Sequence, residues 1–250
     1  MSWGNTGWDL VDVDETKAKQ KFGPKRFWMP PEKTKRIMFL GDDPFVFHEH
    51  SLWNLTKTSA KEICLKRNGI GDECPLCDAE MWPSVVGAFT IIDMGDVVPG
   101  KKKGETKLEG WTNDKGQTFQ FGRKLYTPKR GGKDKPGILR KIQRLSEKKG
   151  GLIGTVWDVY RSGQKVESVG DEFEFVERVD KDKWTEYLVN LGANPEYLSL
   201  EVIDYNKAFQ PSSVEELRGL VGGTPKVTET TPGGVEKVDL GDDDDIPFDL

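Results

Sequence analysis

Cysteine and histidine are scarce in this chain, which has three cysteines and two histidines in 250 residues. An odd number of cysteines cannot all pair within one chain, and no charged segment followed by an apolar one opens the sequence. These absences argue against a secreted protein stabilised by disulfides. Long apolar runs are also missing, and none approaches the roughly 20 residues needed to cross a bilayer. We therefore expect a soluble, cytoplasmic protein without a membrane partner.

The few cysteines and histidines all lie in one stretch, between His48 and Cys77. Cys74 and Cys77 are separated by two residues, a spacing that lets both thiolates bind one ion about 2.3 Å away. Cys64 supplies a third thiolate, and a histidine completes a tetrahedral set. Because four protein ligands leave no open position, we expect one structural Zn²⁺ per chain.

The residues leave the choice of histidine open between His48 and His50. Both would point to the same side of a strand, and we choose His50 because it lies nearer the Cys74–Cys77 turn. The cysteines could instead be small buried hydrophobes or a redox pair. A redox CxxC normally begins a helix in a βαβ unit, whereas this one follows a glycine-rich loop. Zinc is therefore the favoured interpretation.

The net charge of −5 conceals an uneven distribution of charged residues. Residues 21–150 carry 26 basic and 16 acidic groups, a net charge of +10. Residues 151–220 carry a net charge of −7, and residues 221–250 carry −6. A basic body followed by an acidic end favours a polyanion-binding surface with a tail of opposite charge.

From Arg26 onward, short runs rich in β-branched and aromatic residues alternate with turn residues, as is typical of an all-β domain. Strands are expected at 26–29, 36–40, 85–92, 118–126, 152–160 and 172–177, and a helix is expected from Ile138 to Gly150. Three strands, a helix and two strands is the element order of an OB-fold, a five-stranded barrel that commonly binds oligonucleotides. The predicted fold class is mainly β with peripheral helices: an OB-fold barrel with an inserted zinc-binding subdomain and a disordered acidic C-terminal tail.

This pattern divides the chain into four parts. They are an N-terminal arm (1–24), the OB-fold core (25–180, with the zinc-binding insertion at 44–82), a helical extension (181–221), and a flexible linker with an acidic tail (222–250). Trp3 and Trp8 of the arm fit either docking on a neighbouring copy along DNA or folding back on the same chain. Ser212 and Ser213, each three residues before a glutamate, are candidate caps of a short last helix.

The Cys64-x9-Cys74-x2-Cys77 spacing with an upstream histidine resembles the zinc module inserted in the OB-fold of the helix-destabilising, single-stranded-DNA-binding protein of T-even phages. The resemblance covers roughly residues 25 to 180 in order of elements, and it implies His50 and the three cysteines as ligands. It also implies a bacteriophage protein of the infected bacterial host cell that coats and protects single-stranded DNA during DNA replication, recombination and repair. Such a role makes and breaks no bond, so an enzyme is not expected.

The end of the chain resembles the C-terminal tip of bacterial single-stranded-DNA-binding proteins. The matching residues are Asp242, Asp243, Asp244, Asp245, Ile246, Pro247 and Phe248. This resemblance implies a tail that recruits replication and recombination proteins. A tail serving solubility alone would not need the apolar residues that follow the aspartates.

Single-strand binding would combine phosphate neutralisation with stacking of bases on aromatic rings, each base contributing roughly 1–3 kcal/mol. The candidate phosphate contacts are Lys25, Arg26, Arg36, Arg123, Lys124, Lys129 and Arg130. The candidate stacking residues are Trp28, Trp111, Tyr126 and Trp157.

Two other functional classes have to be considered. A zinc-ribbon or transcription module reading duplex DNA would need a recognition helix, and only the helix at 138–149 is basic enough. A zinc-dependent nucleobase deaminase combines H-x-E with P-C-x-x-C. Here His50 stands where that glutamate belongs, and a third cysteine takes the place of the catalytic water.

Overall fold

The computed structural model describes residues 24–102, 105–112, 118–132 and 137–222. The predicted arm and acidic tail, with Trp3, Trp8 and the residues from Asp242 to Phe248, lie outside these ranges. Within the described ranges, no helix combines the length and the apolar character needed to span a membrane.

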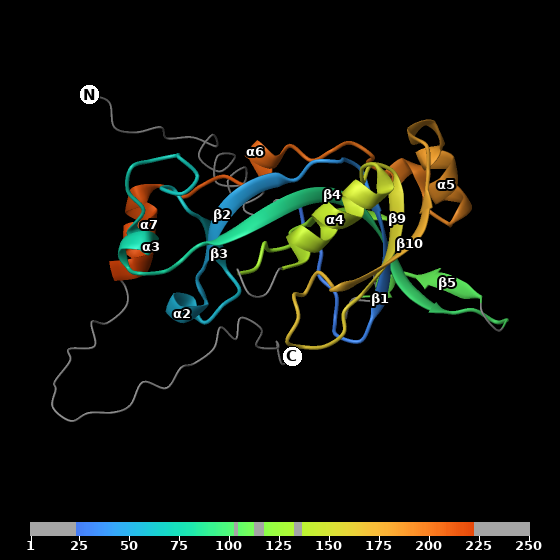
Figure 1. Ribbon diagram of the computed structural model, residues 1–250, viewed down its shortest axis with the longest axis horizontal. Coiled ribbons are helices and arrows are strands. Elements are labelled where there is room, and N and C mark those ends of the chain that lie inside the picture. The colour runs from blue at the N-terminus through green and yellow to red at the C-terminus, as the bar shows by residue number, and fades with distance from the viewer. Residues whose placement is uncertain (1–23, 103–104, 113–117, 133–136, 223–250) are drawn as a thin grey trace, which may run out of the picture.

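The fold is organised around one long strand, β4 (Ser84–Pro99). In the described residues, an eight-stranded sheet has the order β10-β9-β1-β4-β2-β3, and β5 and β8 also pair with β4 (Figure 1). The other strands are β1 (Thr34–Phe39), β2 (Phe45–Ser51), β3 (Lys61–Ile63), β5 (Thr106–Glu109), β8 (Gly122–Tyr126), β9 (Thr155–Tyr160) and β10 (Glu172–Arg178). A separate pair consists of β6 (Trp111–Thr112) and β7 (Thr118–Phe119).

β4 has partners on both edges. Asp93 is opposite Ile37 of β1 and also opposite Gly122 of β8, so these two strands lie on opposite edges. β2 continues along β4 where β1 stops, pairing with Ser84 to Ala88. All of these pairs are antiparallel. The strand therefore positions the segment that carries the histidines and cysteines, residues 48–82, at one end and the β9–β10 pair near the other.

The helices lie around this sheet and at its ends. They are α2 (Trp53–Thr56), α3 (Pro75–Asp78), α4 (Ile138–Lys149), α5 (Trp184–Asn190), α6 (Tyr205–Ala208) and α7 (Val214–Gly222), with short 3₁₀ turns at Lys181–Lys183 and Pro195–Tyr197. α4 ends at Gly150, whose φ of 68° is the left-handed conformation that glycine adopts without strain. α4 approaches β4 so closely that a Cβ on Gly87 would lie 2.5 Å from Leu139 Cδ1.

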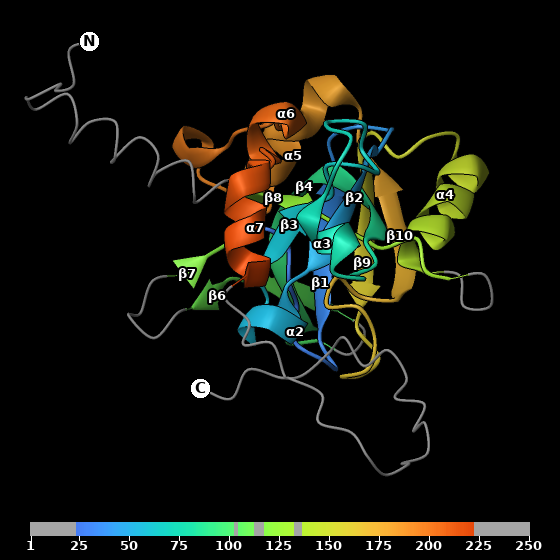
Figure 2. The same ribbon diagram turned by 90° about the vertical axis from the view of Figure 1, so that its left-hand side faces the viewer.

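Side chains alternate between two apolar clusters on the two faces of the sheet. Phe39 and Ile91 belong to a cluster completed by α4, whereas their neighbours Met38 and Ile92 belong to one completed by Trp184 of α5. This period-2 alternation is what a strand buried on both faces produces. Figure 2 shows α4 and α5 in separate places around the sheet.

The prediction of a mainly β fold with peripheral helices is confirmed. The strand expected at 85–92 is longer than predicted, and the one expected at 118–126 is split at Phe121, which has a φ of 55°. The segment 26–29 is no strand and forms only an isolated bridge between Arg26 and Leu125. Short runs of β-branched and aromatic residues predicted the strands, but the positive φ at Phe121 has no signature in the sequence.

Candidate metal centre and nucleic-acid interface

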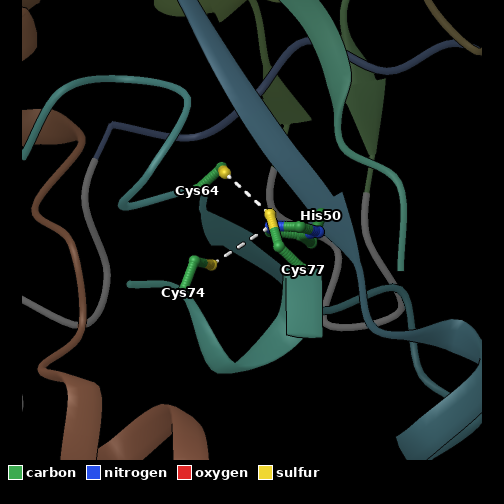
Figure 3. Close-up of side chains that lie close together, drawn as sticks. All are labelled: His50, Cys64, Cys74 and Cys77. Atoms are coloured by element: carbon green, nitrogen blue, oxygen red, sulfur yellow. Dashed lines mark hydrogen bonds between the residues drawn. The ribbon is translucent and has the colours of Figure 1, made fainter. Parts of the chain in front are cut away.

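Four side chains from separate elements converge at one end of the sheet. His50 is on β2, Cys64 follows β3, Cys74 precedes α3 and Cys77 is within α3. Their ligand atoms all lie within 4.8 Å of one another (Figure 3). His50 Nε2 is 3.5 Å from Cys74 Sγ and 3.7 Å from Cys77 Sγ, and Cys64 Sγ is 3.5 Å from Cys77 Sγ.

These separations fit a tetrahedral zinc site. With Zn–S distances of about 2.3 Å and Zn–N distances of about 2.0 Å, two sulfurs should be about 3.8 Å apart and a sulfur and a nitrogen about 3.5 Å apart. Three of the four residues are buried and Cys77 is half-buried, so most of the ligand set is shielded from bulk water. This buried group could hold a metal ion such as zinc.

Local structure explains how the Cys74–Cys77 pair and Cys64 are oriented. Pro75 occupies the first position of α3, where its missing N–H costs no hydrogen bond. The single helical turn then brings Cys77 back beside Cys74. After Cys64 the chain turns so that the Arg67 N–H donates to Cys64 Sγ at 3.3 Å. Such N–H···S bonds stabilise a thiolate.

This environment shifts the pKa values of the three thiols in different directions. Burial raises the pKa of Cys77 to about 12, and the neighbouring thiols Cys64 and Cys74 add to the effect. Burial also raises the pKa of Cys64, although the Arg67 N–H opposes it. For Cys74, burial is outweighed by backbone N–H groups, including those of Cys77 and Leu65, and its pKa is lowered. A bound cation would favour all three thiolates.

His50, and not His48, joins this cluster. Burial lowers the pKa of His50, with the Met81 backbone offsetting part of the shift, and the neutral imidazole is the form that binds metal. His48 is half-buried, and its Nδ1 lies 3.4 Å from Asn68 Oδ1. The two histidines therefore have different surroundings although only one residue separates them.

Sequence reasoning missed Asn68, which joins the turn after Cys64 to β2. Its Nδ2 donates to the carbonyls of His48 and Cys64 at 2.8 and 2.7 Å, and its Oδ1 accepts the His48 N–H at 2.8 Å. The Asn68-Gly69 dipeptide is a turn signal that could have drawn attention to it. Its side chain fixes the position of Cys64 relative to the strand that carries His50.

The contribution of α7 to the metal centre was also missed. Leu217 of α7 is fully buried in one apolar cluster with Cys64, Cys74 and Leu76. Arg218 forms an ion pair with Glu73 at 2.9 Å, and Ser212 Oγ donates to Glu62 at 2.9 Å. The end of the described chain thus packs on the metal-binding segment (Figure 1), a contact between residues roughly 150 positions apart that local sequence patterns do not encode.

Four of the predicted phosphate contacts are held by partners within the chain. Arg26 forms a two-bond ion pair with Glu49, at 3.1 and 2.7 Å. Arg36 does the same with Asp158, the residue directly opposite on β9, at 2.6 and 2.7 Å. Lys124 Nζ lies 2.5 Å from Asp93 Oδ2, and Arg123 Nη1 donates to the Glu201 carbonyl at 3.0 Å.

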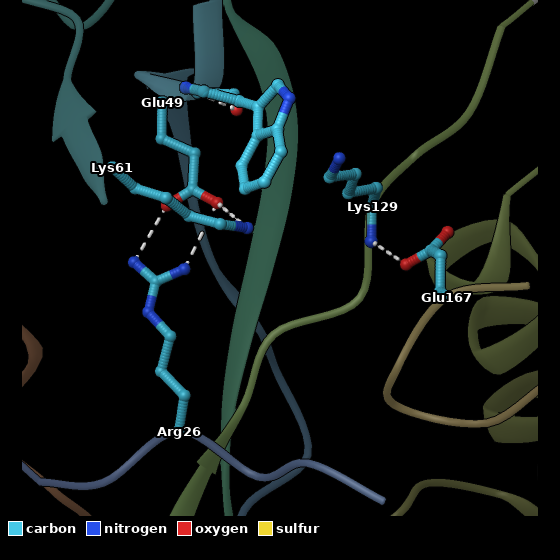
Figure 4. Close-up of polar contacts among 7 residues, drawn as sticks. Arg26, Glu49, Lys61, Lys129 and Glu167 are labelled. Carbon is cyan, nitrogen blue, oxygen red and sulfur yellow. Dashed lines mark hydrogen bonds and ion pairs between the residues drawn. The ribbon is translucent and has the colours of Figure 1, made fainter. Parts of the chain in front are cut away.

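Glu49 forms ion pairs with two basic side chains. It is 3% exposed, and Lys61 Nζ lies 3.2 Å from its Oε1 in addition to the Arg26 pair. Burial raises the pKa of Glu49, but Arg26 and Lys61 outweigh burial and hold this pKa below its usual range. Figure 4 shows the Arg26 guanidinium and the Lys61 amine converging on this carboxylate.

The three remaining predicted cations differ in exposure. Lys25 and Arg130 are exposed, and Lys129 is half-buried. The Lys129 N–H donates to Glu167 Oε2 at 2.8 Å, which fixes the start of the loop that leads to α4 (Figure 4). Burial raises the pKa of Glu167, and the N–H groups of Lys129 and Ile138 only partly oppose this shift.

The predicted stacking residues fall into different environments. Trp28 is 55% exposed. Tyr126 and Trp157 are 0% and 2% exposed and belong to the apolar cluster beneath α4, so the prediction that they stack on bases is wrong. Tyr126 is on β8 and Trp157 is on β9, and both rings lie among the buried residues of those strands. Trp111 lies in β6, and its side chain is outside the described part of the structure.

Comparison with protein-family models, with curated proteins and with solved structures gives no match for this chain. Its function has to be argued from its own residues.

Proposed function

We propose that this chain is a sequence-tolerant single-stranded-DNA-binding protein built on an OB-fold barrel, with one structural zinc ion held by His50, Cys64, Cys74 and Cys77. The observation that carries the proposal is the position of these four side chains. They lie on a segment inserted between β1 and β4 of an antiparallel sheet. In chain order β1, β4 and β8 precede α4, and β9 and β10 follow it, which is the OB-fold element order. Closure into a barrel would bring β8 and β10 together.

The surface chemistry supports a nucleic-acid partner. The exposed Trp28 follows Arg26 by two residues, and Lys25, Arg130 and Lys61 belong to the same basic region of the chain. Cations that contact phosphates and exposed rings that stack on bases are what binding of an unpaired strand requires. Under this proposal the protein coats single strands and its acidic tail recruits replication and recombination proteins.

A duplex-reading module finds less support. It would require α4 to present side chains to a major groove, and α4 packs its apolar side on the sheet, with Ile142 1% exposed. The four-ligand set likewise leaves no position for a catalytic water, so we assign the metal a structural role.

Fluorescence anisotropy with a labelled oligothymidylate and with a duplex of the same length tests the proposal. The single strand should bind at least about tenfold more tightly, and log K should fall linearly with log salt because released counterions drive phosphate binding. Equal affinity for the two forms, or tighter duplex binding, would overturn it.

A further inference from the structure

The C-terminal strap, which we define as residues 198–213, crosses the sheet between two anchored helices. It starts near α5, whose Trp184 and Leu188 are buried, and ends at α7, which packs on the metal-binding segment. Figures 1 and 2 show it passing over the sheet through α6. All strap residues are described, and Ile203 is the one that is buried. The strap is therefore fixed at its ends, and between them Tyr205 and Phe209 are partly buried against an apolar cluster that includes Phe47 and Val86.

The strap contacts β4 and β8 through Thr90 and Arg123. The Ile203 N–H donates to Thr90 Oγ1 at 3.0 Å, and the Tyr205 hydroxyl lies 3.0 Å from the same oxygen. Arg123 of β8 donates to the Glu201 carbonyl. In the order β1, β4, β8 these are the second and third strands of the proposed OB-fold, and the face of those two strands is where OB-folds bind oligonucleotides.

Two aromatic rings of the strap are stacked on rings of β2. Phe209 is parallel to Phe45, with an interplanar angle of 3° and centroids 6.0 Å apart, and it lies 4.4 Å from the Phe47 ring. Tyr205 stacks on the Phe45 ring as well, with an angle of 20° and a centroid distance of 5.4 Å. The Phe45 side chain thus offers a flat face that accepts planar groups.

A cation completes this arrangement. The Arg26 guanidinium carbon lies 5.5 Å from the centroid of the Phe209 ring, while the guanidinium itself is held by Glu49. Aromatic rings stack successive bases in single-strand-binding proteins, and an arginine against such a ring adds a cation–π contact. Arg26 and Arg123, two of the cations predicted to bind phosphate, both contact the strap.

We propose that Phe45 is a base-stacking subsite for unpaired nucleic acid, and that Tyr205 and Phe209 of the strap, with Arg26 against the Phe209 ring, occupy it in the absence of a strand. Binding of a single strand then displaces the two strap rings, and a base stacks on Phe45 in their place. This inference rests on the proposed single-strand binding function.

Affinity measurements on the zinc-loaded full chain test the subsite. Phe209→Ala should bind a labelled oligothymidylate about tenfold more tightly than the wild type at one salt concentration, because the competing ring is gone. Tyr197→Ala, which removes an 82% exposed ring just before the strap, is the matched control and should leave affinity unchanged. Adding Phe45→Ala to Phe209→Ala should abolish the gain. Unchanged or weaker binding by Phe209→Ala would overturn the inference.

Hydrogen exchange on the wild-type protein gives a second test that does not depend on a variant folding. Saturation with oligothymidylate should speed exchange of the amides of Ile203, Ala208 and Phe209, whose acceptors are Thr90, Asp204 and Tyr205. Unchanged or slower exchange at these amides in the saturated complex refutes displacement of the strap while leaving the proposed function intact. Absence of any anisotropy change on adding the oligonucleotide instead refutes both.

Discussion

The metal-binding segment, residues 48–82, and the sheet beneath α4 differ in how they are stabilised. The cluster under α4 buries large rings from four strands, among them Phe39, Phe89, Tyr126 and Trp157. The metal-binding segment has two single-turn helices and a three-residue strand, and its buried cluster consists mainly of leucines and the ligand cysteines. Burial of rings can stabilise the first region alone, whereas we propose that the second depends on metal ligation.

Because of this difference, we expect metal removal and loss of a core ring to affect different regions of the protein. Loss of the metal should release the segment and α7 and leave the sheet, and loss of a core ring should destabilise the whole fold. The following predictions test that separation in order of expected effect.

The largest effect is expected from His50→Ala, which should lose the metal, since three remaining thiolates would leave the site incomplete. His48→Ala is the matched control and should retain about one equivalent of zinc. Metal analysis gives the first readout. In the His50 variant, hydrogen exchange at residues 61–81 and 214–222 should become fast while amides of β4 and β9 stay protected. Equally fast exchange in β4 and β9 would mean that the two regions form one cooperative unit.

A smaller but global effect is expected from Trp157→Ala. Removing a ring that is 2% exposed should lower the free energy of unfolding by about 3–5 kcal/mol, measured by urea denaturation followed by circular dichroism. Zinc should remain bound in the folded fraction. Trp28→Ala removes a ring that is 55% exposed and should change stability by no more than about 0.5 kcal/mol. A loss below about 1 kcal/mol for the Trp157 variant would contradict the proposed division.

Ser213→Ala should act locally on α7. The Ser213 N–H donates to Glu216 Oε2 at 2.7 Å, and the Glu216 N–H donates to Ser213 Oγ at 3.2 Å, the reciprocal pair of a capping box. Losing the cap should cost about 0.5–2 kcal/mol of helix stability, measured as faster exchange in α7. Ser213→Thr keeps a capping hydroxyl and should restore most of the protection. Equal exchange in the alanine and threonine variants would count against the cap.

The smallest effect concerns Glu167, whose carboxyl connects the loop at Lys129 to the start of α4. Burial raises its folded-state pKa, so the folded protein binds a proton more readily than the unfolded chain. Stability should therefore fall as pH rises from the unfolded pKa through the raised folded pKa. Denaturation at a series of pH values should show this slope in the wild type and less of it in Glu167→Gln. Identical slopes would exclude Glu167 as the source.

Several features of this protein followed from the sequence alone. The CxxC spacing identified Cys74 and Cys77 as a pair because two intervening residues fix where both thiols point, and the apolar spacing from Ile138 together with Gly150 defined α4. The spacing to a glutamate likewise predicted a capping serine, but it fitted both Ser212 and Ser213, and the structure identifies Ser213 as the cap. Each of these depends on residues within one turn or strand, where local geometry leaves few alternatives.

Only the tertiary structure decided which residues are buried and which are paired. Tyr126 and Trp157 were predicted to stack on bases, but the structure buries both rings. Arg26 and Arg36 were predicted to bind phosphate, but Glu49 and Asp158 hold them in ion pairs. The packing of Leu217 on the cysteines and of Phe209 on Phe45 joins residues more than 100 positions apart. Such contacts depend on how the strands and the C-terminal strap come together in space, and no local pattern in the chain encodes them.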